Sequence, residues 1–222
     1  IIKKKLSSPA ASLPEVEGHI LQIEVSSTHL LGLLNDILDI SKIEAGKIEL
    51  SEEVFDLNKT LAGVEAIIRP RCQEKNIRFD VSVQGLKHSV FISDPLRLRQ
   101  VLINLLGHSV KFTPECGRVR FTVACLEREP GRSRIAFSVA DNGIGISPEV
   151  RATLFTPFEQ GSQKITQRYG GTGLGLSISR SIVQLMGSDI EVASVEGEGS
   201  EFSFSVWLRE EELRSEDVPQ SG

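Results

Sequence analysis

The sequence has few cysteines and lacks a long hydrophobic run. Its three cysteines, Cys72, Cys116 and Cys125, form no CxxC pair. This pattern predicts reduced thiols and argues against a disulfide framework or a cysteine-based metal site. No apolar run approaches the roughly 20 residues that a bilayer span requires. No apolar segment follows Ile1–Lys5, so they do not form a secretory signal, and they are typical of a boundary inside a longer protein.

An excess of positive charge is also missing. Lys and Arg total 25 and Asp and Glu total 30, so the net charge is −5 with both signs interspersed. This balance argues against a nucleic-acid-binding surface. With 40% hydrophobic residues, the chain has the composition of a globular protein with a sizeable core. We expect a cytoplasmic protein whose residues here make no contact with a membrane.

The pattern of residues divides the chain into three regions. Residues 1–48 hold a long predicted helix, from Pro14 to about Gly46, with apolar residues at intervals of three and four. This helix either packs on its own domain or is half of a helical hairpin that dimerises into a four-helix bundle. The wide apolar stripe before a charged linker favours the hairpin. Residues 210–222 form an acidic tail that we expect to be disordered.

Residues 49–209 mix strands and helices without a strict βαβ order. Asp94-Pro95 is a typical helix start, with an N-cap aspartate and a proline at the first helical position. The predicted helices cover residues 57–75, 95–112 and 173–186, and the predicted strands cover 54–57, 77–83, 90–92, 118–127, 133–140, 190–195 and 201–208. This order predicts an α+β fold, a two-layer sandwich whose mixed, mostly antiparallel sheet is covered by helices on one face.

Two glycine-rich stretches can bind a ligand through their backbone. Asp141 ends an apolar strand just before Gly143 and Gly145, so its carboxylate can accept from an exocyclic amine while the glycines approach a flat ring. An ordinary turn is the alternative. The second stretch, residues 170–176, precedes a helix, whose free amides and dipole favour phosphate oxygens. It matches neither the Walker lysine motif nor a Rossmann unit, and a flexible connection is the alternative.

Aromatic and basic residues separate these two stretches. We expect Phe155 and Phe158 to pack in the core. The polar segment with Lys164, Arg168 and Tyr169 has the composition of a mobile lid whose basic side chains reach phosphates. A solvated loop is the alternative.

Asn104, His108 and Lys111 lie on one helix at spacings of four and three. An amide oxygen can ligate Mg²⁺, and a lysine can neutralise phosphate. Imidazole is a poor ligand for this hard ion. Taken alone, these residues would form a polar helix face.

Together and in this order, these elements resemble the catalytic and ATP-binding domain of sensor histidine kinases. That domain belongs to an ATPase superfamily shared with the ninety-kilodalton heat-shock chaperone, DNA gyrase and the MutL repair proteins. The segments similar to its N box, first glycine box, F box and second glycine box are residues 94–113, 141–146, 154–160 and 170–176. Residues 33–46 are similar to the second helix of the dimerisation and phosphotransfer domain. The resemblance covers about residues 20–208 and implies a Bergerat-type ATP fold.

The resemblance implies ATP and Mg²⁺ as cofactors, and a role for each matching residue. Asn104 and Lys111 would be catalytic, and Asn104 and His108 would face the metal. The nucleotide-binding set would be Asp141, Gly143, Gly145, Ile146, Phe155, Phe158, Lys164, Arg168, Tyr169, Gly171, Thr172, Gly173, Leu174, Gly175 and Leu176. The reaction would transfer the ATP γ-phosphoryl group to a histidine and then to an aspartate of a response-regulator receiver domain.

The family's phosphate-accepting histidine has no match in this chain. An acidic residue and then Arg and Pro normally follow it, but Ile20-Leu21 follows His19 and Leu30-Leu31 follows His29. We expect the helix with the acceptor to lie upstream of Ile1. The chain itself should then not autophosphorylate, and the intact protein should form a homodimer through the complete hairpin.

His108 also departs from the family pattern, because it takes the place of the Mg²⁺-ligating asparagine. This substitution predicts nucleotide binding that is weaker or less dependent on Mg²⁺. It also keeps open an alternative to an active kinase, namely a degenerate, pseudokinase-like nucleotide-binding or regulatory interaction module. A chaperone or DNA-topology ATPase is disfavoured, because Asn104 stands where those enzymes have a water-polarising glutamate.

Overall fold

The computed structural model describes residues 13–157 and 173–211. The chain forms two compact units, Ile1–Lys47 and Ile48–Gly222. In the first unit, helix α2 covers Leu13–Glu44, which confirms the long predicted helix. Gly46 ends it in the left-handed conformation with φ of 62°, and its N–H donates to the Ile43 carbonyl oxygen at 2.9 Å. This is the usual glycine stop of a helix. No helix within the described ranges has the length and hydropathy needed to cross a membrane.

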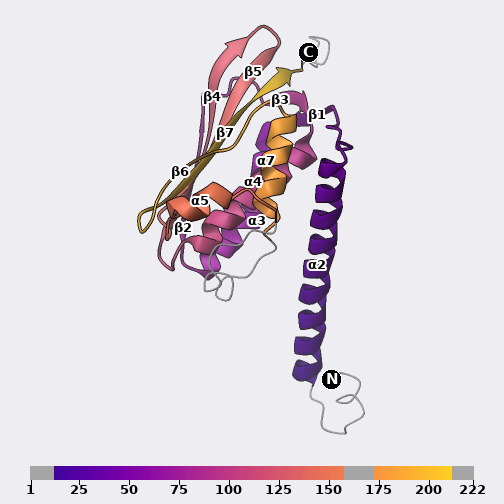
Figure 1. Ribbon diagram of the computed structural model, residues 1–222, viewed down its shortest axis with the longest axis vertical. Helices are drawn as coiled ribbons and strands as arrows, with labels where there is room; N and C mark the ends of the chain where they lie inside the picture. The colour runs from indigo at the N-terminus through magenta and orange to yellow at the C-terminus, as the bar shows by residue number, and fades with distance from the viewer. Residues whose placement is uncertain (1–12, 158–172, 212–222) are drawn as a thin grey trace, which may run out of the picture. The chain divides into compact units, whose positions relative to one another are not determined.

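The second unit is built on one seven-stranded sheet (Figure 1). The strands are β1 (Glu53–Asp56), β2 (Arg78–Gln84), β3 (Val90–Ser93), β4 (Arg118–Glu129), β5 (Arg132–Asp141), β6 (Glu191–Val195) and β7 (Gly199–Glu210). Their order is β1-β3-β7-β5-β4-β2, and β6 also pairs with β7. Only the β2–β4 pair is parallel among the described strands. The predicted mixed, mostly antiparallel sheet is confirmed.

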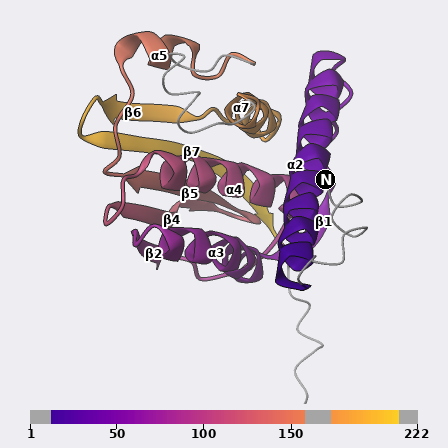
Figure 2. The same ribbon diagram turned by 90° about the horizontal axis from the view of Figure 1, so that it is seen from below.

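Three helices cover one face of this sheet (Figure 2). They are α3 (Leu57–Glu74), α4 (Pro95–Phe112) and α7 (Gly175–Leu185). Alternate residues of the long strands face these helices, so phenylalanines such as Phe121, Phe137 and Phe202 are almost completely buried. Burial of one such ring contributes about 1.5–3 kcal/mol. The hydrophobic core therefore lies between the sheet and the three helices.

Helix α4 is anchored at both of its ends. Asp94 caps its start, accepting from Arg97 N at 2.9 Å and from Ser51 N at 3.0 Å. At the other end, the Lys75 ammonium donates to the carbonyl oxygens of Val110, Lys111 and Thr113 at 2.8, 3.2 and 2.6 Å. A cation at a helix C-terminus satisfies carbonyls that have no partner within the helix. The helix that carries three of the predicted site residues thus has a well-defined position.

The structure differs from the sequence-based expectation in a few elements. A short helix, α5 (Pro148–Thr153), was not predicted, although Ser147 caps it and proline opens it as in α4. Helix α7 begins at Gly175, two residues later than predicted. Strand β7 extends to Glu210, the first residue of the tail that was expected to be disordered, while residues 212–222 lie outside the described part.

Candidate nucleotide-binding site

The loop after β5 is held against the end of α4. The Asp141 carboxylate accepts a hydrogen bond from Gly143 N at 2.9 Å, and Ile144 N donates to the Phe112 carbonyl oxygen at 3.3 Å. A β-carbon on Gly143 would lie 2.6 Å from that same oxygen. Only glycine permits this approach, so the sequence Asp-Asn-Gly is adapted to the contact with α4.

The same loop contacts the turn between β6 and β7 on its other side. Gly145 has φ of 66°, and a β-carbon on it would lie 2.0 Å from the Val195 carbonyl oxygen. Ile146 N donates to Ser194 Oγ at 2.8 Å, and Gly197 N donates to the Ile144 carbonyl oxygen at 2.8 Å. Ser194 and this turn carry no local motif that would predict their role, because the contact joins segments about fifty residues apart.

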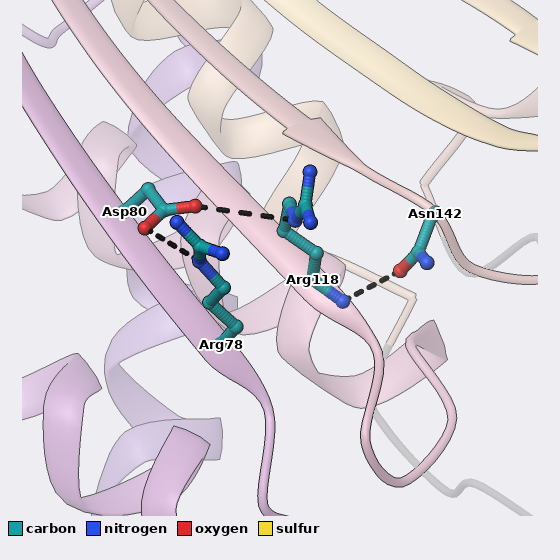
Figure 3. Close-up of polar contacts among 4 residues, drawn as sticks. All are labelled: Arg78, Asp80, Arg118 and Asn142. Atoms are coloured by element: carbon teal, nitrogen blue, oxygen red, sulfur yellow. Dashed lines mark hydrogen bonds and ion pairs between the residues drawn. The ribbon is translucent and has the colours of Figure 1, made fainter.

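Asn142 ties the loop to the start of β4 (Figure 3). Its Oδ1 accepts from Arg118 N at 2.6 Å. Next to it, Asp80 pairs with Arg78 at 3.0 Å and with Arg118 at 4.0 Å. These ion pairs are exposed and contribute little to stability. The amide of Asn142 is therefore a structural element of the loop, while the neighbouring carboxylate of Asp141 is held by its own hydrogen bond to Gly143.

The carboxyl group of Asp141 has a perturbed pKa. Burial raises the pKa of its carboxyl group, while hydrogen bonding from Gly143 N, the nearby Ser109 hydroxyl and the backbone of Ser200 act to lower this pKa. The side chain is only half-buried, so a ligand can reach it. A half-buried carboxylate with a perturbed pKa at the end of a strand is typical of a functional site.

Asn104 joins the two helices that flank the site. Its Nδ2 donates to the Gly175 carbonyl oxygen and to Ser179 Oγ, each at 3.3 Å. Ser179 Oγ in turn donates to the same Gly175 carbonyl at 2.7 Å. The amide nitrogen of Asn104 therefore holds the first turn of α7 against α4. This contact brings the end of the second glycine-rich stretch close to α4.

Lys111 supplies a cation near the end of α4. Its side chain is half-buried, and burial lowers the pKa of its ammonium group. The Nζ atom lies 4.8 Å from the centroid of the Phe112 ring. A partly desolvated ammonium interacts more strongly with a phosphate than one in bulk water. Lys111 is thus suited to an anionic ligand.

His108 packs against two aromatic rings. Its ring centroid lies 4.6 Å from that of Phe112 and 5.3 Å from that of Phe202, which it meets edge-on. Burial, with a smaller effect from the charge of Lys111, lowers the pKa of His108 to about 3. The imidazole is therefore neutral at physiological pH. Because Phe202 is fully buried in the sheet, His108 belongs to the layer between α4 and the sheet.

The residues present do not fit a protein-held Mg²⁺ site at this position. Mg²⁺ prefers oxygen ligands, and His108 offers only nitrogen in an aromatic environment. Nor do the described residues contain a group of three or more His, Cys, Asp or Glu side chains that could hold a metal ion. The expected pair of Asn104 and His108 therefore gives one amide group and one unsuitable imidazole.

The start of α7 is the remaining part of the site. Gly173 has φ of 72°, Leu174 is buried and Gly175 opens the helix, with Leu176 in its first turn. Because leucine has no polar side-chain atom, the N-cap residue does not cap the first amides of α7. Such amides bind anions well.

Phe155 lies near the same helix, 4.9 Å beneath the guanidinium of Arg180, which also forms two hydrogen bonds with Asp189 at 2.7 and 2.8 Å. Phe155 is only half-buried and does not belong to the hydrophobic core, so the prediction that it packs in the core is wrong. The other predicted site residues lie outside the described part of the chain, namely Phe158, Lys164, Arg168, Tyr169, Gly171 and Thr172. The described site residues come from α4, from the loop after β5 and from the region around α7.

Comparison with known families agrees with this fold and site. Residues 93–211, more than half of the chain, match the family described as histidine kinase-, DNA gyrase B-, and HSP90-like ATPase. The chain belongs to this family, and the matched region is its catalytic ATP-binding domain. The match includes α4, the loop after β5 and the whole of α7.

Within this family, the chain is similar to sensor histidine kinases. It is 34% identical over 206 residues to the autoinducer 2 sensor kinase/phosphatase LuxQ of Vibrio cholerae, covering 93% of this chain and 24% of LuxQ. It is 41% identical over 200 residues to the sensor histidine kinase AruS of Pseudomonas aeruginosa, covering 89% of this chain and 20% of AruS. The chain thus spans a quarter or less of the length of these relatives. Their names favour a kinase over the degenerate module.

Solved structures show the same relationship. Full-length ShkA in complex with AMPPNP matches with a TM-score of 0.73 and 33% identity, over 92% of this chain and 41% of ShkA. The catalytic domain of the histidine kinase ThkA matches with a TM-score of 0.57 and 28% identity, over 72% of this chain and 95% of that domain. The histidine kinase AdeS of Acinetobacter baumannii shares the fold, with a TM-score of 0.64 at 20% identity over 92% of each chain.

Proposed function

We propose that this chain is the ATP-binding and phosphoryl-donating domain of a two-component sensor histidine kinase. The observation that carries the proposal is the half-buried Asp141 carboxylate, held by Gly143 N at 2.9 Å between α4 and the β6–β7 turn. A carboxylate in this position can accept a hydrogen bond from the 6-amino group of adenine. The structure of ShkA in complex with AMPPNP matches 92% of this chain and supports a nucleotide at this site.

The triphosphate would extend from Asp141 towards the start of α7. Amides of the first turn of α7 and the ammonium of Lys111 would neutralise its charge. Asn104 would act by holding α7 in position, since its Nδ2 already binds Gly175 and Ser179. We assign the phosphate contacts of the second glycine-rich stretch to Gly171, Gly173 and Gly175.

The reaction we propose moves the γ-phosphoryl group from ATP to a histidine nitrogen outside this chain. The bond from the γ-phosphorus to the β,γ-bridging oxygen breaks, a phosphorus–nitrogen bond forms, the imidazole loses a proton and ADP leaves. The phosphoryl group would then pass to an aspartate of a receiver domain. Little covalent chemistry falls to the protein, which positions the reactants and neutralises charge.

We also propose that α2 pairs with another helix in the intact protein. Eight of its apolar side chains are 48–61% exposed: Ile20, Leu21, Ile23, Leu30, Leu31, Leu34, Ile37 and Leu38. A stripe of this size favours burial in a helical bundle between two copies. Leu34→Glu should then weaken dimerisation of the intact protein, which sedimentation velocity measures. An unchanged sedimentation coefficient would argue against this role.

Calorimetric titration with AMPPNP tests the nucleotide site. We expect binding in both Mg²⁺ and EDTA, with a smaller Mg²⁺ effect than in a His108→Asn variant that restores an amide oxygen. Equal Mg²⁺ effects in the two proteins would contradict the role given to His108. Absence of AMPPNP binding under both conditions would overturn the nucleotide site itself.

Phosphoryl transfer needs a separate experiment. The chain would be mixed with radiolabelled ATP and, in turn, with two separately produced helical hairpins of sensor histidine kinases, each with an acceptor histidine. We expect label on the hairpin and none on the chain itself. Nucleotide binding without transfer to either hairpin would favour a nucleotide-binding regulatory module over a kinase.

A further inference from the structure

One serine hydroxyl joins the loop after β5 to β7 through three hydrogen bonds. Ser194 Oγ, on β6, accepts from Ile146 N at 2.8 Å, and it lies 2.9 Å from the Gly199 carbonyl oxygen. Ser200 Oγ is also 2.9 Å away. The carbonyl of Gly199 can only accept, so it takes the single proton of Ser194. The Ser200 hydroxyl is then the donor in the third bond, and the hydrogen-bonding capacity of Ser194 is used in full.

These bonds connect both ends of the loop to the same part of β7. The loop runs from Asp141 to Ile146. At its first end, Asp141 pairs with Ser200 in the sheet, and the backbone of Ser200 acts to lower the pKa of the Asp141 carboxyl group. At its second end, Ile146 reaches Gly199 and Ser200 through the Ser194 hydroxyl. The hydroxyl therefore helps to fix the distance between the two ends of the loop.

The β6–β7 turn also meets the loop through backbone groups. Gly197 N donates to the Ile144 carbonyl oxygen at 2.8 Å. This bond involves no side chain, so it persists when Ser194 is substituted. Strand β6 pairs only with β7 among the described strands, so no second neighbouring strand fixes its position. The hydroxyl of Ser194 is therefore the part of this junction that a substitution can test.

We propose that Ser194 is a positioning residue, whose hydroxyl holds the loop of residues 141–146 in the nucleotide-binding conformation before the ligand arrives. This inference rests on the proposed function and adds a residue that acts through the loop rather than on the ligand. Without the hydroxyl, the half-buried Ile146 amide loses its acceptor, and fewer molecules keep the ordered loop. The apparent affinity for nucleotide then falls with the fraction of molecules in the competent conformation.

Two variants of the same shape test the proposal. Threonine keeps the hydroxyl of Ser194, valine replaces it by a methyl group, and both residues suit a β-strand. Calorimetry should show that Ser194→Val binds AMPPNP about 5-fold more weakly than wild type, the equivalent of about 1 kcal/mol for one hydrogen bond. Ser194→Thr should keep the wild-type affinity. Equal affinities of the two variants, whether both weak or both strong, would overturn the proposal, because the hydroxyl would then have no effect.

Amide hydrogen exchange separates positioning from a general loss of stability. The Gly143 amide donates to the Asp141 carboxylate at 2.9 Å, so its exchange rate reports the order of the loop. In ligand-free Ser194→Val, this amide should exchange about 5-fold faster than in wild type, and saturating AMPPNP should restore slow exchange. Wild-type exchange in the ligand-free variant would mean that the loop does not need the hydroxyl, which would overturn the proposal.

Ser205→Val is the matched control. The Ser205 hydroxyl, on β7, accepts from Arg134 Nε at 3.1 Å, and Ser205 pairs with Ala136 in the middle of β5. This variant should keep the wild-type affinity for AMPPNP. A loss equal to that of Ser194→Val would mean that any such change in the sheet weakens binding, which contradicts the role of Ser194. Absence of AMPPNP binding by wild type would instead defeat the proposed function itself, so the two failures are distinguishable.

Discussion

Gly199, at the start of β7, touches the backbone of Asp141 at the end of β5. A β-carbon on Gly199 would lie 2.0 Å from the Asp141 carbonyl oxygen, and Gly199 has φ of 126°. The two residues are on neighbouring strands, where Asp141 pairs with Ser200. The position of the carboxylate thus depends on a glycine 58 residues later in the sequence, which belongs to none of the four family boxes.

This contact predicts that Gly199→Ala destabilises the protein and displaces Asp141. We expect a loss of about 3 kcal/mol in the free energy of unfolding, because the methyl group meets backbone and the φ value is strained. Gly131→Ala is the matched control, since its φ is 76° but a β-carbon would meet nothing within 4 Å. It should cost about 1–2 kcal/mol from backbone strain alone. Equal losses in urea unfolding would contradict the steric explanation.

Asp141→Asn should weaken ATP binding by about 10-fold or more. The amide oxygen of asparagine can still accept from Gly143 N, but a neutral acceptor forms a weaker hydrogen bond with the adenine amino group than a carboxylate does. Asp80→Asn is the control, because the Asp80 carboxylate pairs with two exposed arginines at the surface. Calorimetry with AMPPNP should show wild-type affinity for this control. Equal affinities for both variants would contradict the role of Asp141.

His108 should make stability depend on pH below neutrality. Its pKa is about 3 in the native state and 6.5 in the unfolded chain, so the unfolded chain binds one more proton between these values. The stabilisation is complete above pH 6.5 and is lost as the pH falls. The slope reaches about 1.4 kcal/mol per pH unit. Between pH 4.5 and 7 in EDTA, the free energy of unfolding of His108→Asn, measured in urea, should change less with pH than that of wild type. Identical slopes would contradict the lowered pKa of His108.

Lys75→Met should destabilise α4 and the site attached to it. The variant keeps an apolar stem but leaves three carbonyl oxygens without their ammonium partner. We expect a loss of about 2–3 kcal/mol in the free energy of unfolding. Lys59→Met, at an exposed lysine near the start of α3, should change stability by less than about 0.5 kcal/mol. A similar small effect of Lys75→Met would show that water replaces the ammonium.

Helix boundaries were predictable where the signal is local. Asp94-Pro95 and Gly46 mark the start of α4 and the end of α2 because capping involves only neighbouring residues. The Ser147-Pro148 start of α5 carries the same signal, but six residues are too few to show helical periodicity.

The sequence by itself determined the family, the order of the elements and the positions of Asp141, Asn104 and Lys111. These depend on local motifs and on residue spacing along single helices and strands. Only the tertiary structure decided that His108 packs against Phe112 and Phe202, and that Ser109 is completely buried on α4. Both outcomes depend on which strands lie beneath α4. Strand pairing joins residues far apart in the chain, so no local pattern records it.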